Sequence, residues 1–126
     1  FTISYWAKFD SASLSNDNLI FSLKQDSSNH LYVGIDSSER VVFGSGDTNT
    51  MATKLRNNIN ITDWNNYTFT YSKRSKLRTI YINGKRIRSD KTQAFNIPTP
   101  TTCYIGYDGT NATEAFIYDF RIYRKD

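Results

Sequence analysis

The chain has 126 residues and a formal net charge of +4, which suits one domain with a buried core and leaves little room for a second. Its 6 Gly and 2 Pro exclude a collagen-like or disordered composition, whereas nine Tyr, eight Phe and two Trp favour pleated strands over helices. The single cysteine, Cys103, excludes an internal disulfide, and with one histidine the chain lacks the ligands for structural zinc.

Short runs of alternating or wholly apolar residues recur along the chain between clusters of Asp, Ser, Asn and Gly, which predicts strands joined by turns. In the first run every second residue from Phe1 to Phe9 falls on one face, and Trp6 falls on the other. Further strands are predicted at residues 19–23, 31–35, 41–43, 64–72, 77–82, 86–88, 102–107 and 115–123. The stretch 44–60 has no clear strand pattern, and Leu55 and Ile59 either belong to a short helix or close the edge of the core.

The patterns within these strands indicate how they pair. Tyr67, Phe69 and Tyr71 alternate with Thr and Ser, as expected where one face of an antiparallel sheet is buried. Asn83-Gly84 lies between two strand-like runs and predicts a tight hairpin. We therefore predict an all-β fold, a two-sheet antiparallel β-sandwich.

The largest side chains are expected to interlock in the dry layer between the two sheets. Trp6, Trp64 and Phe120 are predicted to be among them. Cys103 is flanked by apolar residues and is expected to be a buried, unreactive thiol.

Three segments, in chain order, carry a family resemblance. They are the opening strand 1–8, the tryptophan-led strand 64–71 followed by 80–85, and the two closing strands at 104–106 and 117–123. Together they resemble the laminin-G-like modules of the concanavalin A-like lectin and glucanase superfamily. The resemblance implies a jelly-roll sandwich and a binding module of an extracellular or surface protein.

The resemblance covers nearly the whole chain, so residues 1–126 are interpreted as a single domain, and we expect them to be a piece of a larger protein. Members of the family usually carry one further strand before the first one of this chain, and that strand is absent from this sequence. Asn65 and Asn66 stand where histidine is frequent in the family, and Ala115 where glycine is frequent. These departures bear on the ligand site more than on the fold.

Catalysis is not expected. The glucan-cleaving members of the superfamily carry two glutamates and an aspartate at alternating positions of one strand, because retaining hydrolysis needs two carboxyl groups about 5 Å apart. The only glutamates of this chain, Glu39 and Glu114, are far apart and have no acidic neighbour two or four residues away. His30 would have to serve any nucleophile as base, and its Ser-Ser-Asn-His context indicates a solvated loop histidine instead.

The first candidate site is the set of polar loops at the strand ends. Relatives of this fold bind calcium or glycans there, and calcium favours Asp and Asn oxygens. The residues considered for calcium are Asp36, Asp47, Asp108 and Asn111. Tyr107, Asp108 and Asn111 are considered for glycan, with Tyr107 stacking on a sugar ring. Turns also favour Asp and Asn for conformational reasons, so the absence of any cofactor and a bound calcium ion both stay open.

The second candidate site is a basic hairpin that holds half of the 16 Lys and Arg residues. Its members are Lys73, Arg74, Lys76, Arg78, Lys85, Arg86, Arg88 and Lys91. Such a surface suits an acidic polysaccharide or an acidic protein, although Lys and Arg also protect an edge strand from aggregation. No nucleic-acid-binding motif accompanies the charge, so nucleic acid is not the expected partner.

Two functions are carried forward. The first is a non-catalytic recognition or adhesion module that binds glycan or an anionic polysaccharide. The alternative is a structural domain that packs against neighbouring protein chains and binds no soluble ligand. No apolar run approaches the ~20 residues of a membrane span, so no membrane insertion is expected.

Overall fold

A computed structural model describes residues 1–11, 14–46, 48–56, 58–92, 99 and 102–124. These residues form ten strands and no helix. The strands are β1 (Thr2–Phe9), β2 (Asn18–Lys24), β3 (His30–Ile35), β4 (Arg40–Ser45), β5 (Thr50–Lys54), β6 (Asn65–Ser72), β7 (Leu77–Ile82), β8 (Lys85–Lys91), β9 (Thr102–Ile105) and β10 (Ala115–Tyr123).

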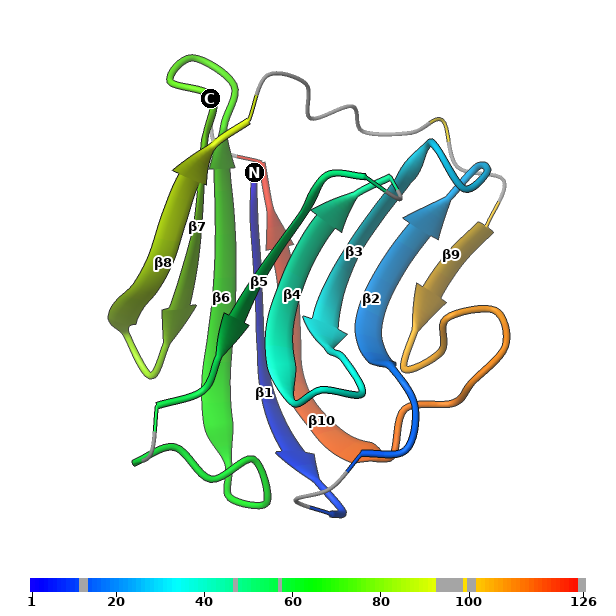
Figure 1. Cartoon of the computed structure of the whole chain (residues 1–126), viewed down its shortest axis with the longest axis vertical. Helices are drawn as coiled ribbons and strands as arrows, with labels where there is room; N and C mark the ends of the chain where they lie inside the picture. The colour runs from blue at the N-terminus through cyan, green and yellow to red at the C-terminus, as the bar shows by residue number, and fades with distance from the viewer. Residues whose placement is uncertain (12–13, 47, 57, 93–98, 100–101, 125–126) are drawn as a thin grey trace.

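The described strands form two five-stranded sheets that lie face to face (Figure 1). The back sheet has the order β10-β1-β6-β7-β8, and the front sheet, nearer the viewer, has the order β5-β4-β3-β2-β9. Every neighbouring pair is antiparallel. The predicted two-sheet antiparallel sandwich is therefore confirmed.

The core consists of the side chains that alternate inward from both sheets. Tyr5 of β1 stacks on Tyr67 and Phe69 of β6, with ring centroids 5.5 and 5.9 Å apart. Phe43 of the front sheet meets Phe69 edge-on at 5.5 Å. Because aromatic pairs add to the burial of their large apolar area, these rings join the two sheets into one core.

Two of the three aromatic residues predicted for this layer lie elsewhere. Phe120 packs against the core, its ring 5.5 Å from that of Phe21, as predicted. Trp6 and Trp64 are 37% and 47% exposed, so that part of the prediction is wrong. The layer between the sheets is filled instead by Tyr5 and its neighbours.

The structure tests three further expectations from the sequence. The stretch 44–60, which has no clear strand pattern, contains β5, in which Met51 is the one fully buried side chain. The expectation that this stretch holds no strand is therefore wrong. Leu55 and Ile59 pack against the edge of the core, which decides between the two alternatives left open. Cys103 is exposed and not buried, because it lies on the edge strand β9.

The predicted hairpin at Asn83-Gly84 is confirmed. Both residues have positive φ angles, 52° and 78°, as a tight two-residue turn between twisted strands requires. The described residues include no helix that is long and apolar enough to span a membrane.

Candidate functional site

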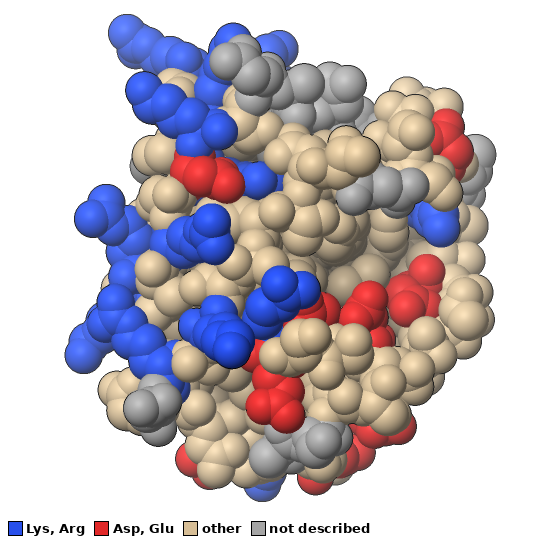
Figure 2. Space-filling model, viewed as in Figure 1, with Lys and Arg blue, Asp and Glu red and all other residues tan. Residues whose placement is uncertain are grey.

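A polar pocket of about 330 Å³ lies on the outer face of the front sheet. Figure 2 shows this face hollowed, with acidic residues along one border of the hollow. We call it the central pocket, and its lining residues are Asp17, Leu19, Lys24, His30, Tyr32, Asp36, Val42, Thr50, Asp108 and Thr110. Its size lies within the range of small-molecule sites, roughly 300–1,000 Å³.

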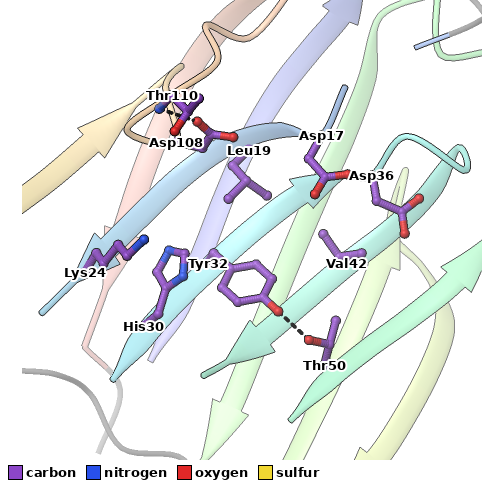
Figure 3. A pocket seen from close by; sticks show the side chains of 10 residues that line it. All are labelled: Asp17, Leu19, Lys24, His30, Tyr32, Asp36, Val42, Thr50, Asp108 and Thr110. Atoms are coloured by element: carbon purple, nitrogen blue, oxygen red, sulfur yellow. Dashed lines mark hydrogen bonds between the residues drawn. The ribbon is translucent and has the colours of Figure 1, made fainter. Parts of the chain in front are cut away.

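The floor of the central pocket depends on a glycine. Tyr32 of β3 pairs with Gly44 of β4, which in turn pairs with Thr50 of β5, so the three residues form one cross-strand row. The Tyr32 ring lies across Gly44, where an added Cβ would overlap it, and its hydroxyl is hydrogen-bonded to that of Thr50 (Figure 3). Gly44 thus allows an aromatic ring to lie flat along the sheet, which creates an apolar plane in a polar pocket.

His30 extends this plane. Its ring centroid lies 4.6 Å from that of Tyr32, and its Nε2 is 2.6 Å from the Ser22 hydroxyl on β2. Lys24 pairs directly with His30 across the two strands, and both line the same end of the pocket (Figure 3). The prediction of a solvated loop histidine is therefore wrong, because His30 begins β3 and is half-buried.

Two carboxylates lie at the opposite end of the pocket, and both hold turns in place (Figure 3). Asp17 accepts a hydrogen bond from the Ser37 backbone N–H at 2.9 Å. Asp36 accepts the backbone N–H groups of Ser38 and Arg40, and its other oxygen pairs with the Arg40 guanidinium at 2.7 Å. The charge of Asp36 is therefore largely balanced within the protein.

The loop after β9 brings a third carboxylate to the pocket. Asp108 accepts the backbone N–H groups of Thr110 and Asn111 at 2.7 and 2.6 Å. Burial raises the pKa of Asp108, but these hydrogen bonds and one from the Asn111 side chain outweigh burial and lower it from its ordinary value. Tyr107 lies beside this loop, its ring edge-on to Tyr104 at 5.1 Å, and is not a lining residue.

The binding of calcium stays a prediction. Asp36 and Asp108 line one pocket, but their oxygens already accept hydrogen bonds from their own turns, and Asn111 donates to Asp108. Nowhere in the described part of the chain are three or more His, Cys, Asp or Glu side chains grouped for a metal. Asp47, the remaining residue considered for calcium, lies outside the described residues.

The basic hairpin forms a separate surface on the β7–β8 side of the molecule, where Figure 2 shows Lys and Arg gathered. Seven of its eight cations are exposed. We call these the basic edge: Lys73, Arg74, Lys76, Lys85, Arg86, Arg88 and Lys91. The guanidinium of Arg88 reaches the neighbouring sheet and donates to the Ala52 carbonyl at 2.5 Å, so the basic edge extends toward β5.

Arg78, the eighth cation of the hairpin, is a correction to the predicted binding set. It is 3% exposed and forms a two-armed pair with Asp90, at 2.6 and 3.0 Å. It also donates to the carbonyls of Phe43 and Asn49 in the front-sheet half of the molecule, at 3.0 and 2.9 Å. Arg78 therefore links the two sheets and does not present its charge to a ligand.

Sequence reasoning named Asp36 and Asp108 but missed most of the central pocket. Lys24, His30 and Tyr32 come from two adjacent strands, and each lies at an outward position of the alternating pattern. Outward polar and aromatic residues facing each other on paired strands are the signal that could have identified them. That signal requires the pairing of β2 with β3, which the turn at 25–29 suggests.

A family profile described as "Concanavalin A-like lectin/glucanases superfamily" matches residues 1–126, the whole chain. The chain belongs to this superfamily. The laminin-G-like resemblance of its strands is thereby confirmed. Among proteins with curated functions, none matches the chain.

Solved structures of similar fold include the CBM40 of the Ruminococcus gnavus IT-sialidase bound to α2,3-sialyllactose, with 16% identity and a TM-score of 0.67 over 93% of this chain and 74% of that one. Domains LG4-5 of the mouse laminin α1 chain match with 12% identity and a TM-score of 0.68, over 95% of this chain and 34% of that one. A structure of botulinum neurotoxin type C matches with 20% identity and a TM-score of 0.64, over 94% of this chain and 31% of that one. The cell entry of that toxin is described as dependent on interaction with two ganglioside molecules. At these identities the likeness establishes the fold.

Proposed function

We propose that this domain is a non-catalytic glycan-recognition module of an extracellular or surface protein, and that the central pocket holds the sugar. The observation that carries the proposal is the row in which Gly44 lets the Tyr32 ring lie flat beside charged and hydroxyl side chains. A pyranose ring has a C–H face that suits an aromatic plane and hydroxyl groups that need hydrogen-bond partners.

The lining of the pocket matches both requirements. Tyr32 and His30 supply the ring faces, while Lys24, Asp17 and Asp108 surround them with charged donors and acceptors. The similar folds support the same ligand class, since the sialidase CBM40 was solved with sialyllactose. Because carboxylates outnumber the lysine in this pocket, we expect an uncharged sugar to bind more tightly than its sialylated counterpart.

A glycan array tests the proposal, followed by calorimetric titration with lactose and sialyllactose. Tyr32→Ala is expected to weaken binding about tenfold, the loss that corresponds to one aromatic contact of roughly 1.4 kcal/mol. Tyr123→Ala is the matched control, because Tyr123 is an exposed tyrosine on the other sheet and should leave the affinity unchanged. Equal affinities of the two variants, or an array without any hit, would refute the central pocket as a sugar site.

The basic edge supports a second candidate function, the binding of an acidic polysaccharide. Seven exposed cations from one turn and one edge strand lie on one side of the molecule, away from the carboxylates of the central pocket. This separation supports the proposal that neutral and anionic ligands bind to different surfaces. The structural alternative, packing against neighbouring protein chains, predicts instead that the isolated domain binds neither ligand and associates in sedimentation experiments.

A further inference from the structure

The outer face of the back sheet, opposite the central pocket, carries a cluster of exposed aromatic side chains. Trp6 and Trp64 are 37% and 47% exposed, Phe116 62% and Tyr118 67%. We call these four residues the aromatic patch. Large aromatic side chains seldom remain in water in such numbers on one face without a binding role.

Strand pairing brings the rings of the aromatic patch together. Trp6 of β1 pairs directly with Tyr118 of β10, and both point outward because Tyr5 and Ile117 on either side point toward the core. Trp64, just before β6, meets the Tyr118 ring edge-on at 6.4 Å and 75°. Trp6, Trp64 and Tyr118 line a shallow apolar cavity of about 420 Å³.

A β-bulge makes this arrangement possible. The register of β10 shifts by one residue opposite Tyr5, and Asp119 has a positive φ of 51° at that point. The extra residue lets Tyr118 point outward while Phe120, two residues later, points inward and stacks with Tyr5 at 6.4 Å. Without the bulge the two aromatic side chains would lie on the same face. The bulge therefore allows β10 to place Phe120 in the core and Tyr118 in the patch.

Hydrogen-bonding groups follow the aromatic rings along the same face. Asn66 of β6 pairs with Trp6, and its amide lies 3.4 Å from the Ser4 hydroxyl. Ser4 and Thr68 are in turn hydrogen-bonded across the strands at 3.1 Å. Arg121 pairs with Ser4 from the other side. Aromatic faces therefore lie next to a row of amide, hydroxyl and guanidinium groups.

We infer that the aromatic patch is a second saccharide-binding surface, on which a pyranose ring stacks on Trp6, Trp64 and Tyr118. The adjacent row of Asn66, Ser4 and Arg121 would bind the hydroxyl groups of the same or the next sugar unit. An uncharged oligosaccharide fits both the aromatic rings and this row of hydrogen-bonding groups. An organic cation fits less well, because Lys8 pairs with Phe116 and places a positive charge beside the rings, whereas the charge of Asp119 is balanced by Arg121 at 2.7 Å.

A protein partner is a weaker match to this face. Beyond the four rings the exposed aromatic surface of this face includes, among the described residues, only Tyr123 on β10, and the outward residues of β1 and β6 are otherwise polar, mainly Ser, Thr and Asn. A stable protein interface needs about 800 Å² per partner with an apolar centre, more than four rings on a polar ladder provide. A sugar chain needs only the narrow strip of rings and hydroxyl groups that is present.

The chain offers a readout specific to this surface, because both of its tryptophans belong to the aromatic patch and the central pocket is lined by neither. Lactose, cellotetraose and maltotetraose are titrated into the domain while tryptophan emission is recorded. At least one of them is expected to produce a saturable change in emission. Tyr118→Ala keeps both reporters and should weaken that binding about tenfold, while Tyr107→Ala, an exposed tyrosine in the loop after β9 and away from the patch, should not.

The tryptophan titration tests the aromatic patch independently of the calorimetric test of the central pocket. Tyr32→Ala should leave the tryptophan titration unchanged even where it weakens the calorimetric binding at the central pocket, so the prediction for either site can fail alone. No emission change with any of the three sugars would overturn the inference. So would concentration-dependent dimerisation in sedimentation that Tyr118→Ala abolishes, because the patch would then be an interface between copies of the chain.

Discussion

At the residue scale, the core contains two tyrosines whose hydroxyl groups are buried without a hydrogen-bond partner among the described residues, Tyr5 and Tyr67. Their rings stack 5.5 Å apart. Burial, together with the nearby Tyr67, raises the pKa of Tyr5 well above its ordinary value. Burial also raises the pKa of Tyr67, and the nearby Asn65 side chain only partly opposes that rise. The folded protein therefore holds both groups in the neutral form.

These two residues make stability sensitive to alkaline pH. In the unfolded chain tyrosine ionises near pH 10, whereas in the folded state both protons are retained, so the unfolded state loses protons first. The stabilisation is fully present below about pH 10 and is lost as pH rises further. Melting temperatures measured from pH 8 to 12 should therefore fall steeply above about pH 10, and less steeply for Tyr5→Phe/Tyr67→Phe.

The same double variant should be more stable than the parent at neutral pH, by about 1 kcal/mol, because it removes two buried hydroxyl groups that lack partners. Tyr118→Phe is the control, since Tyr118 is exposed and its hydroxyl is solvated. If the double variant is less stable at pH 7, the two hydroxyl groups have partners in solution, and burial of unpartnered hydroxyl groups is not the cause of the alkaline loss.

The two tryptophans show what single residues can and cannot reveal in a sequence. The alternation of residues 1–9 placed Trp6 opposite the core face correctly, and only the assumption that large aromatic residues belong inside placed it in the dry layer. In a strand the face is fixed by the period of two and not by the size of the side chain. Where the pattern and the size disagree, the pattern is the better guide.

At the element scale, the hairpin of β7 and β8 is joined to the front sheet by a buried charged residue. Arg78 is buried, pairs with Asp90, and donates to the carbonyls of Phe43 and Asn49. Removing a partner from a buried ion pair typically costs about 3–5 kcal/mol. Since the Asp90 side chain is 30% exposed, water can solvate it partly, and we expect a cost at the lower end of that range.

Arg78→Met should therefore lower the free energy of unfolding by about 3 kcal/mol in urea titrations. Arg86→Met is the matched control on the same hairpin, because Arg86 is exposed and its loss should change stability by less than about 0.5 kcal/mol. Similar unfolding midpoints for the two variants would show that Arg78 contributes little to holding the sheets together.

Strand patterns predicted most of the elements, and the exception has a physical cause. β5 is an edge strand that turns only Met51 fully into the core, so its sequence lacks the alternation that marks a half-buried strand. The central pocket was harder to predict, because its residues extend from Asp17 to Thr110 and meet only once the sheet order is known. Sequence alone gives the faces of strands but not which strands are neighbours.

At the scale of the whole molecule, charge is distributed unevenly over the surface. The basic edge lies along β8 and the turn between β6 and β7, whereas carboxylates border the central pocket (Figure 2). The net charge of +4 therefore understates the positive potential on one side. Such a surface attracts a polyanion at low ionic strength, and at about 0.1 M salt screening confines the attraction to about 10 Å.

Retention on a heparin column should accordingly depend on which cation is changed and not only on the total charge. Arg86→Glu reverses a charge within the basic edge, and Lys8→Glu makes the same change in net charge on the outer face of the back sheet. We expect Arg86→Glu to elute at clearly lower salt than the parent and Lys8→Glu to elute close to it, because screening limits each charge to its own surroundings. Equal shifts for the two variants would mean that the column senses the net charge alone, and the basic edge would then be a solvated strand edge that protects the sheet from pairing.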